Sequence, residues 1–316
     1  VFNWGDYIAE ETIEKFEQET GIKVVYDIFD SNESMYTKLK SKAVDYDVLI
    51  PSDYMIEKLI LEDMLLPLNY DNIPNYIEID EEFKNLAFDS KNLYSVPYMW
   101  GTLGILYNEK LVSQKVDSWN ILWDESYKDQ IIMKDSVRDS FVPALKLLGY
   151  SINSSDQNQW NEALDLLFAQ KEIIQGYAAD EVRDKMIGEE AALALMYSGE
   201  AILTMEENEN LAYVVPSEGS NMWFDSMCIP NTSKNQAAAE AFINFMCDPQ
   251  IAFENADYIG YSTPISAAKA LLDEEIQNDL AAYPPQEILD QCEVFIDLGE
   301  EMSSFTNDKW NELKAY

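Results

Sequence analysis

The sequence predicts an α/β protein in which strands and helices alternate and the sheets are largely parallel. Short apolar runs, "DVLIP" and "AALALM" among them, are separated by polar loops and longer amphipathic runs. This alternation is typical of strands that are covered by helices. The 316 residues are expected to form one or two domains. A hydrophobic content of 47% indicates a globular chain.

The first third of the chain shows this alternation clearly. Its first helical run is closed by Gly21, because glycine is favoured just after a helix C-terminus. Ser31 or Asn32 is suited to cap the next helix. Strands are expected at residues 1–4, 22–29, 47–51 and 93–108, and helices at 8–19, from the cap to 42, and at 53–65.

The second half of the chain repeats the theme. Pro143 is expected in the first turn of a helix, where it is tolerated, and Gly149 is expected to end that helix. The run at 235–248 is strongly amphipathic, because its large apolar residues share one helix face. Strands are expected at residues 131–133, 191–196, 212–216 and 222–230, and helices at 140–149, 201–208 and 235–248.

The charge balance is strongly acidic, with 59 acidic against 21 basic residues and a net charge of −38. Nucleic acid is excluded as an expected partner, because phosphate contacts need a basic surface. An acidic field favours cationic ligands. The simpler interpretation, that most of these carboxylates only solubilise the surface, accounts for the bulk of the charge.

The chain contains no histidine, which removes the usual zinc ligand and every Ser-His or Cys-His catalytic pair. No G-x-G-x-x-G, P-loop or G-x-S-x-G motif occurs. Cys228, Cys247 and Cys292 are expected to be free thiols, although the sequence leaves one disulfide open. No apolar run approaches the roughly 18 residues that cross a bilayer. Because the chain starts inside an expected strand, an export segment is expected to have been removed.

The strand-to-helix loops are where ligands bind in open α/β sheets. In this sequence the same residue types recur there, namely aromatic rings beside carboxylates. The loop residues of this kind, with their neighbouring serines, are Trp4, Asp6, Tyr7, Ser52, Asp53, Tyr54, Asp135, Ser136, Asp139, Tyr197, Glu200, Trp223, Asp225 and Tyr261.

The pairing of ring and carboxylate suits an amine. An aromatic face attracts a cation and covers a methylene chain, and a carboxylate forms a charge-assisted hydrogen bond with an ammonium group. Each loop taken alone has a structural explanation as well. A single ring at a strand end is usually core, and a single aspartate before a helix is usually an N-cap, which would explain Asp53 and Asp135. The coincidence over several loops is what favours a binding site.

Seven segments of the sequence, taken in order, resemble a known protein family. The segments are "FNWGDYI", "FEQETGIKVVYD", "SNESMYTKLK", "YDVLIPSDYMIEKL", "YSVPYMWGTLGILYN", "MWFDSMCIP" and "IGYSTP". In this order they closely resemble the extracytoplasmic polyamine-binding proteins of ABC importers, the spermidine/putrescine group. The resemblance implies a type II periplasmic-binding-protein fold, with two lobes, a hinge and a ligand cleft. Lobe one would comprise residues 1–104 plus 225–274, and lobe two residues 105–224 plus 275–316.

The resemblance also implies residue roles. The aromatic box of the family falls on Trp4, Tyr7, Tyr54, Trp223 and Tyr261, its cleft serine on Ser52, and its amine-binding acids on Asp6, Asp139 and Asp225. This sequence departs from the family pattern at several positions. It has Ser136 in place of an acid (with Asp135 adjacent as a substitute), Asp139 in place of a glutamate, Tyr197 in place of a tryptophan, Phe295 in place of a glutamine and Ala179 in place of a serine. These changes replace polar contacts by apolar ones and leave the preferred polyamine open.

The function that the resemblance implies is a non-enzymatic receptor, without cofactor or bound metal, that captures a linear polyamine. It would act outside the cytoplasm, in the periplasm or as a cell-surface lipoprotein, as a monomer that delivers its ligand to the transmembrane subunits of an ABC permease. Two alternatives stay open: a receptor for another organic cation such as a quaternary amine, and a carboxylate-dependent glycosidase.

Overall fold

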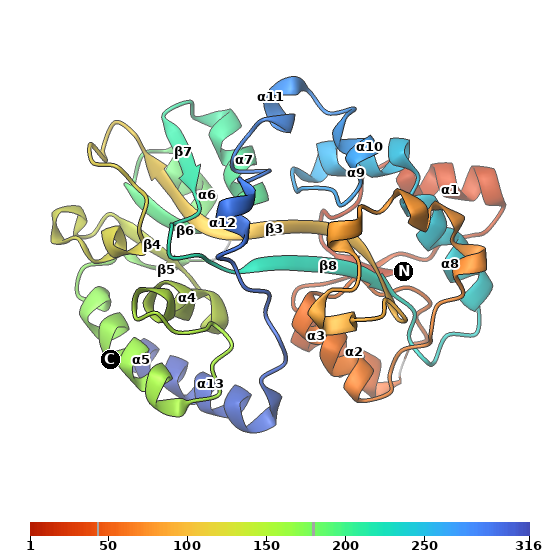
Figure 1. Ribbon diagram of the computed structural model, residues 1–316, viewed down its shortest axis with the longest axis horizontal. Helices are drawn as coiled ribbons and strands as arrows, with labels where there is room; N and C mark the ends of the chain where they lie inside the picture. Colours follow the sequence, from red (N-terminus) through yellow and green to blue (C-terminus); the bar gives the residue numbers. More distant parts are fainter. Residues whose placement is uncertain (43, 179–180) are drawn as a thin grey trace. The chain divides into compact units, whose positions relative to one another are not determined.

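The chain folds into two compact units (Figure 1). The computed structural model describes residues 1–42, 44–178 and 181–316, so the predicted substitution at Ala179 lies outside the described residues. Unit 1 consists of residues 1–100 and 223–277, and unit 2 consists of residues 101–222 and 278–316. Two long strands, β3 (Ser95–Asn108) and β8 (Met222–Cys228), each cross a boundary between the units.

Unit 1 is built on short parallel strand pairing. β1 (Phe2–Trp4) pairs with β2 (Asp27–Phe29), so the strand expected at 22–29 is confirmed only at its end. The segment at 47–51 forms no regular strand, because it pairs only through bridges of Leu49 to Phe2 and to Cys228. The helices of unit 1 are α1 (Thr12–Thr20), α2 (Asn32–Ser41), α3 (Asp53–Leu61), α8 (Gln236–Met246), α9 (Pro249–Ile259), α10 (Ser266–Lys269) and α11 (Glu274–Gln277).

The ends of the first two helices follow the local sequence. Gly21 adopts a left-handed conformation with φ of 72° and donates its N–H to the Glu17 carbonyl, which ends α1 as predicted. Ser31 caps α2, because its side chain accepts a hydrogen bond from the Ser34 N–H while the Ser34 hydroxyl contacts the Ser31 N–H. Four short 3-10 turns then lead from α3 to β3, at Tyr70–Asn72, Pro74–Glu78, Glu81–Phe83 and Ala87–Asp89.

Unit 2 contains a mixed sheet rather than a largely parallel one. Its strands β4 (Ile131–Lys134), β5 (Gly176–Ala178), β6 (Leu193–Tyr197) and β7 (Leu211–Val214) combine with β3 in the order β5-β4-β6-β3-β7. β4 is parallel to β5 and β6, whereas β3 is antiparallel to β6 and β7. Two 3-10 turns, Trp119–Trp123 and Glu125–Tyr127, precede β4.

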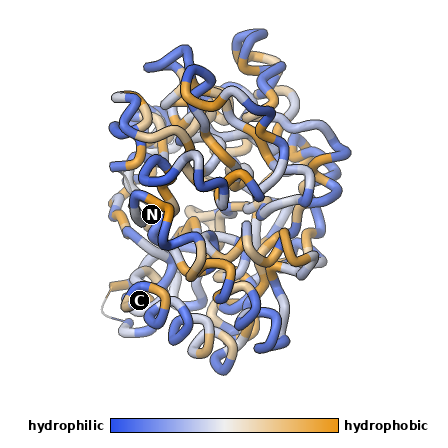
Figure 2. The backbone as a smooth tube through the Cα atoms, turned by 90° about the vertical axis from the view of Figure 1, so that its left-hand side faces the viewer, coloured by the Kyte–Doolittle hydropathy of each residue, from blue (hydrophilic) through white to orange (hydrophobic). Residues whose placement is uncertain are grey.

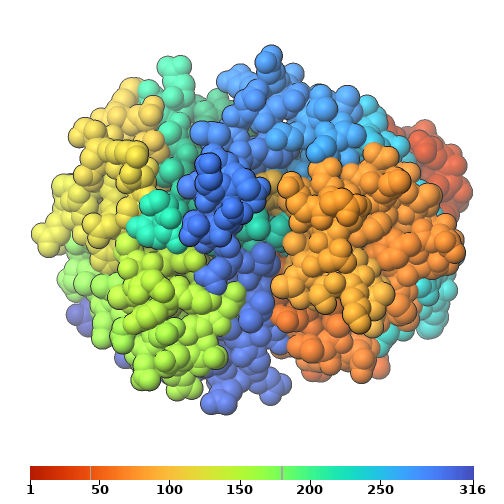
Figure 3. All heavy atoms as spheres, viewed as in Figure 1, coloured from red at the N-terminus to blue at the C-terminus, as the bar shows by residue number. Residues whose placement is uncertain are grey.

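The helices of unit 2 cover this sheet and form a second core. They are α4 (Val137–Leu147), α5 (Gln157–Lys171), α6 (Glu181–Ile187), α7 (Ser198–Glu207), α12 (Gln286–Leu289) and α13 (Gly299–Ala315). Phe141 on α4, Trp160 on α5 and Trp310 on α13 are buried in one cluster. The C-terminal residues, blue in Figures 1 and 3, therefore return to helices in the middle of the sequence, which are green.

The predicted first residue of the helix at 140–149 in unit 2 is wrong. α4 begins at Val137 and not at Ser140, so Pro143 lies inside the helix and not in its first turn. Proline has no N–H to donate, so the carbonyl one turn earlier, on Asp139, loses its helical partner. The irregularity thus falls beside an acid that the sequence assigns to the ligand site.

The hydropathy of the chain fits these two cores. Figure 2 shows that hydrophobic stretches lie mostly inside and hydrophilic stretches mostly at the rim. All three cysteines are free thiols, and Cys228 and Cys247 are buried. Within the described residues, no helix combines the length and the apolar character needed to cross a bilayer.

Candidate functional site

Three aromatic rings of unit 1 form a cluster at the start of β8. The rings of Trp223 and Tyr261 meet edge to face with centroids 4.8 Å apart, and the Tyr7 ring lies 5.9 Å from that of Tyr261. Tyr7 and Trp223 are only 6% and 9% exposed. Rings in this arrangement present faces that attract a cation or cover a hydrocarbon chain.

A buried carboxylate lies beside these rings. The Tyr7 hydroxyl donates a hydrogen bond of 2.8 Å to Oδ2 of Asp225. The other oxygen, Oδ1, is buried and has no hydrogen-bond partner among the residues that the structure describes. Burial raises the pKa of Asp225 to about 6, and the hydroxyls of Ser52 and Tyr7 act in the opposite direction. An orphaned acceptor of this kind is costly in an empty site and is suited to a cationic donor.

The other predicted residues of unit 1 lie around this centre. Ser52 forms an antiparallel bridge with Asp225, and its Oγ accepts a 3.1 Å hydrogen bond from Nδ2 of Asn32. The same amide donates to the Tyr54 hydroxyl at 3.1 Å. The structure thus brings Tyr7, Ser52, Tyr54, Trp223, Asp225 and Tyr261 into one connected group.

Trp4 and Asp6 are placed differently. The Trp4 ring packs against Phe29 with centroids 4.5 Å apart, and its Nε1 is buried without a hydrogen-bond partner in the described part of the chain. Asp6 is exposed and has a φ of 49°, in the left-handed region. Their assignment to the site therefore depends on the sequence alone and stays a prediction.

Unit 2 contains a second acid-aromatic cluster, at the N-terminus of α4. Oδ2 of Asp139 accepts hydrogen bonds from the Ser136 hydroxyl at 2.6 Å and from the Tyr197 hydroxyl at 2.7 Å. Asp139 is 4% exposed, and its Oδ1 is buried without a partner among the described residues. The cluster therefore repeats the pattern of Asp225. One carboxylate oxygen accepts hydrogen bonds from protein hydroxyls, and the other has no hydrogen-bond partner among the described residues.

Two further predicted residues of unit 2 contact cations of the protein itself. Asp135 is exposed and forms an ion pair of 2.8 Å with Lys314, whose ammonium also lies over the rings of Tyr177 and Trp310. Phe295 is 6% exposed, and the guanidinium carbon of Arg138 lies 4.1 Å from its ring centroid.

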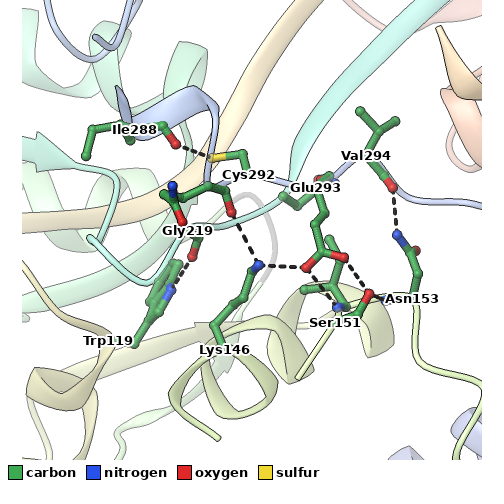
Figure 4. Close-up of polar contacts among 12 residues, drawn as sticks. Trp119, Lys146, Ser151, Asn153, Gly219, Ile288, Cys292, Glu293 and Val294 are labelled. Atoms are coloured by element: carbon green, nitrogen blue, oxygen red, sulfur yellow. Dashed lines mark hydrogen bonds and ion pairs between the residues drawn. The ribbon is translucent and has the colours of Figure 1, made fainter. Parts of the chain in front are cut away.

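Phe295 belongs to a segment that we call the C-terminal strap, residues 291–296. Figure 4 shows polar contacts of Cys292, Glu293 and Val294 in this strap. Glu293 binds Lys146 with an N–O distance of 2.6 Å, and its backbone N–H donates to the Ser220 carbonyl. Nδ2 of Asn153 donates to the Val294 carbonyl at 2.8 Å. The strap passes so close to Gly219, which has a φ of 83°, that an added Cβ would lie 1.9 Å from the Gln291 carbonyl oxygen.

The whole chain also resembles known proteins. The family model "Bacterial extracellular solute-binding protein" matches residues 11–284. The chain belongs to this family. The solute-binding protein is 35% identical to the spermidine/putrescine-binding periplasmic protein of Salmonella typhimurium, with 99% of this chain and 90% of that protein covered. It is 31% identical to the putrescine-binding periplasmic protein SpuD of Pseudomonas aeruginosa, with 100% of this chain and 91% of that protein covered.

Solved structures agree with this assignment. The solute-binding protein is 46% identical to the spermidine/putrescine ABC transporter substrate-binding protein PotD of Streptococcus pneumoniae, solved with calcium and HEPES, at a TM-score of 0.92 and with 100% of this chain and 98% of that one covered. The lipoprotein Tp0655 (TpPotD) of Treponema pallidum is 28% identical at a TM-score of 0.90, with 99% and 98% covered. The predicted periplasmic-binding-protein fold is confirmed.

Several residues of the solute-binding protein that contact the candidate site were not predicted. Tyr98 supports Tyr7 from behind, because its hydroxyl donates to the Tyr7 carbonyl at 2.9 Å and the two rings meet edge to face. Lys134 lies over the ring of Tyr197, with Nζ 4.0 Å from the centroid. Tyr98 sits in an apolar run that looks like ordinary core, so the sequence carries no signal for it. Lys134 directly follows a predicted strand and could have been found there.

Proposed function

We propose that this solute-binding protein captures a linear diamine or polyamine of the putrescine and spermidine class and delivers it to the permease of an ABC importer. The observation that carries the proposal is the buried Asp225, which has one oxygen without a partner among the described residues and lies among the rings of Tyr7, Trp223 and Tyr261. An ammonium group would bind the carboxylate while the methylenes pack on the rings. The names of the relatives support the same ligand class.

The second part of the proposal is that Asp139 binds another amine of the same ligand. Asp139 also has a buried, unpartnered oxygen among the described residues, next to Tyr197. The remaining predicted residues, Trp4, Asp6, Ser52, Tyr54, Asp135, Ser136 and Phe295, complete the proposed ligand site.

The proposed contacts are sufficient in energy. A micromolar dissociation constant corresponds to about 8 kcal/mol. Two desolvated cation–π contacts contribute about 2 kcal/mol each, and two or three charge-assisted hydrogen bonds contribute roughly 1.5–3 kcal/mol each. The sum, roughly 7–13 kcal/mol, reaches the requirement, and its upper part also covers the cost of ordering the ligand. No reaction step is needed, so the protein is proposed to act without catalysis, as a monomer outside the cytoplasm.

Calorimetric titration with putrescine, cadaverine, spermidine, spermine and choline tests the ligand class. At least one of the four linear amines is expected to bind at micromolar concentration. Choline is expected to bind far more weakly, because its quaternary nitrogen has no proton to donate to Asp225. Failure of all four linear amines at millimolar concentration, with a folded protein, would exclude the proposal. Tighter binding of choline would favour a quaternary-amine receptor.

Hinge closure is the proposed accompanying motion. The proposed lobes are residues 1–104 plus 225–274 and residues 105–224 plus 275–316, joined by extended segments that include parts of β3 and β8. Ligand contacts from both lobes would stabilise a closed state. Small-angle X-ray scattering is expected to show a smaller radius of gyration at saturating amine. An identical scattering profile with and without bound amine would contradict a mobile hinge.

A further inference from the structure

Lys134 is a cation of the protein at the candidate site in unit 2. It is the last residue of β4, and its side chain is 15% exposed. Its ammonium nitrogen lies 4.0 Å from the ring centroid of Tyr197 and 3.1 Å from Oε2 of Glu200. The distance to the ring is well inside the range in which a cation is attracted to an aromatic face.

The ring that Lys134 covers is directly connected to the acid of this cluster. The Tyr197 hydroxyl donates to Asp139 at 2.7 Å, so the ammonium, the ring and the carboxylate form a continuous chain of contacts. Lys134 therefore occupies one face of the Tyr197 ring with a cation of the protein itself. Its charge also repels any ammonium group that approaches Asp139, and this repulsion grows with the number of charges on the ligand.

Arg138 is a further cation near this cluster, but it has a structural task. Its guanidinium group donates hydrogen bonds to the carbonyls of Ile296 and Ile152 and to Oδ1 of Asn153, and it stacks on Phe295. Its removal would take away a hydrogen bond to Ile296 of the C-terminal strap and the stacking on Phe295. Among the described residues, the Lys134 ammonium group contacts the side chains of Tyr197 and Glu200, so its charge can be changed with less disturbance to the backbone.

We propose that Lys134, balanced by Glu200, is a specificity-determining residue that limits how many positive charges the site accepts. This inference rests on the proposed function. The cation on Tyr197 leaves Asp139 able to hold one ligand ammonium group and opposes additional ones nearby. The protein therefore selects diamines over amines with three or four charges.

The test compares the affinities for putrescine and spermine in matched variants. Lys134→Met keeps an unbranched side chain one atom shorter and removes the charge, so the ratio of spermine to putrescine affinity is expected to rise about tenfold. Glu200→Gln removes the opposing charge and leaves Lys134 in place, so the ratio is expected to fall by a similar factor. Lys134→Arg is expected to keep the wild-type ratio, because the cation is retained.

The expected changes in the affinity ratio have opposite signs in the two variants, and this distinguishes charge selection from a merely structural ion pair. Both Lys134→Met and Glu200→Gln break the pair, so a structural role would move the ratio in the same direction or leave it unchanged, and either result would overturn the inference. If the wild-type protein bound none of the four linear amines, the proposed function itself would fail, which the titration with unmodified protein shows first.

Lys110 provides the matched control. The substitution Lys110→Met removes the same charge from unit 2. The Lys110 side chain is 61% exposed and paired with Glu189. Leu103 of β3 pairs with Tyr197, whereas Lys110 follows the far end of that strand, about 17 Å further along at the usual strand rise. This separation exceeds the Debye length of about 8 Å at physiological salt. Lys110→Met is expected to leave the ratio unchanged, and an equal rise in this variant would overturn the inference in favour of diffuse charge.

Discussion

Replacement of Asp225 by asparagine is expected to weaken amine binding by roughly 30- to 150-fold, which corresponds to about 2–3 kcal/mol. The substitution keeps the shape of the side chain and its contact with the Tyr7 hydroxyl, which now meets a neutral oxygen. The ligand ammonium loses a charge-assisted partner at a place where water cannot replace it, because Asp225 is only 6% exposed. Calorimetric titration with the preferred amine measures the change.

Glu14→Gln is the control for this experiment. Glu14 is an exposed acid on α1, and its carboxylate binds only the neighbouring Gln18 in the described contacts. Its replacement removes one negative charge and is expected to change affinity by less than about twofold in physiological salt, because distant exposed charges are screened. Equal losses in the two variants would mean that diffuse acidity recruits the amine, and the assignment of Asp225 would then be wrong.

Amine affinity is expected to fall steeply as the pH drops below about 6. Burial raises the pKa of Asp225 from 3.8 to about 6, so protonation removes the carboxylate in mildly acid solution. At pH 4.5 only about 3% of a group with this pKa is ionised, which predicts roughly 30-fold weaker binding. The amine does not contribute to this step, because aliphatic ammonium groups keep their proton below about pH 10. The pKa of Tyr7 is raised well above its ordinary value, so its hydroxyl stays protonated.

The same group links pH to the stability of the empty protein. Because the folded pKa of Asp225 is raised, its contribution to stability is fully present below 3.8 and is lost as the pH rises through about 6. A bound amine compensates the buried charge, so the stabilisation by ligand should be larger at pH 7 than at pH 5. Amine titrations from pH 4.5 to 7.5 measure the fall in affinity at low pH and the pH dependence of the stabilisation by ligand. Asp225→Asn should lack the step near pH 6, and a step that survives in this variant would assign it to another acid.

The parts of the fold that could be predicted are those that local chemistry determines. Gly21 ends α1 and Ser31 caps α2 because a left-handed residue and a short hydroxyl side chain suit those two places. The alternation along β8 placed Trp223 and Asp225 on the same side of a strand, and both residues lie in the unit 1 cluster. The alternation of strands and helices predicted the α/β class, and the order of family motifs predicted the periplasmic-binding-protein fold.

The parts that could not be predicted depend on partners distant in the sequence. Asp135 looks like an N-cap or a ligand residue, and nothing near it indicates an ion pair with Lys314, 179 residues away. The segment at 47–51 has the composition of a strand, but its neighbours β1 and β8 pair with it at single residues only. Lys134 is itself a cation, and acids and rings, not cations, are the residue types that indicate an amine site.

The two units have a consequence for the order in which the protein can fold during synthesis. Each unit combines an early stretch of the chain with a late one, and unit 2 needs residues 278–316. When α4 and α5 leave the ribosome, the apolar face that Phe141 and Trp160 present still lacks Trp310 of α13. Because such a long loop must close before these stabilising contacts form, we expect unit 2 to fold slowly. The nascent helices would stay incompletely packed until the last helix is made.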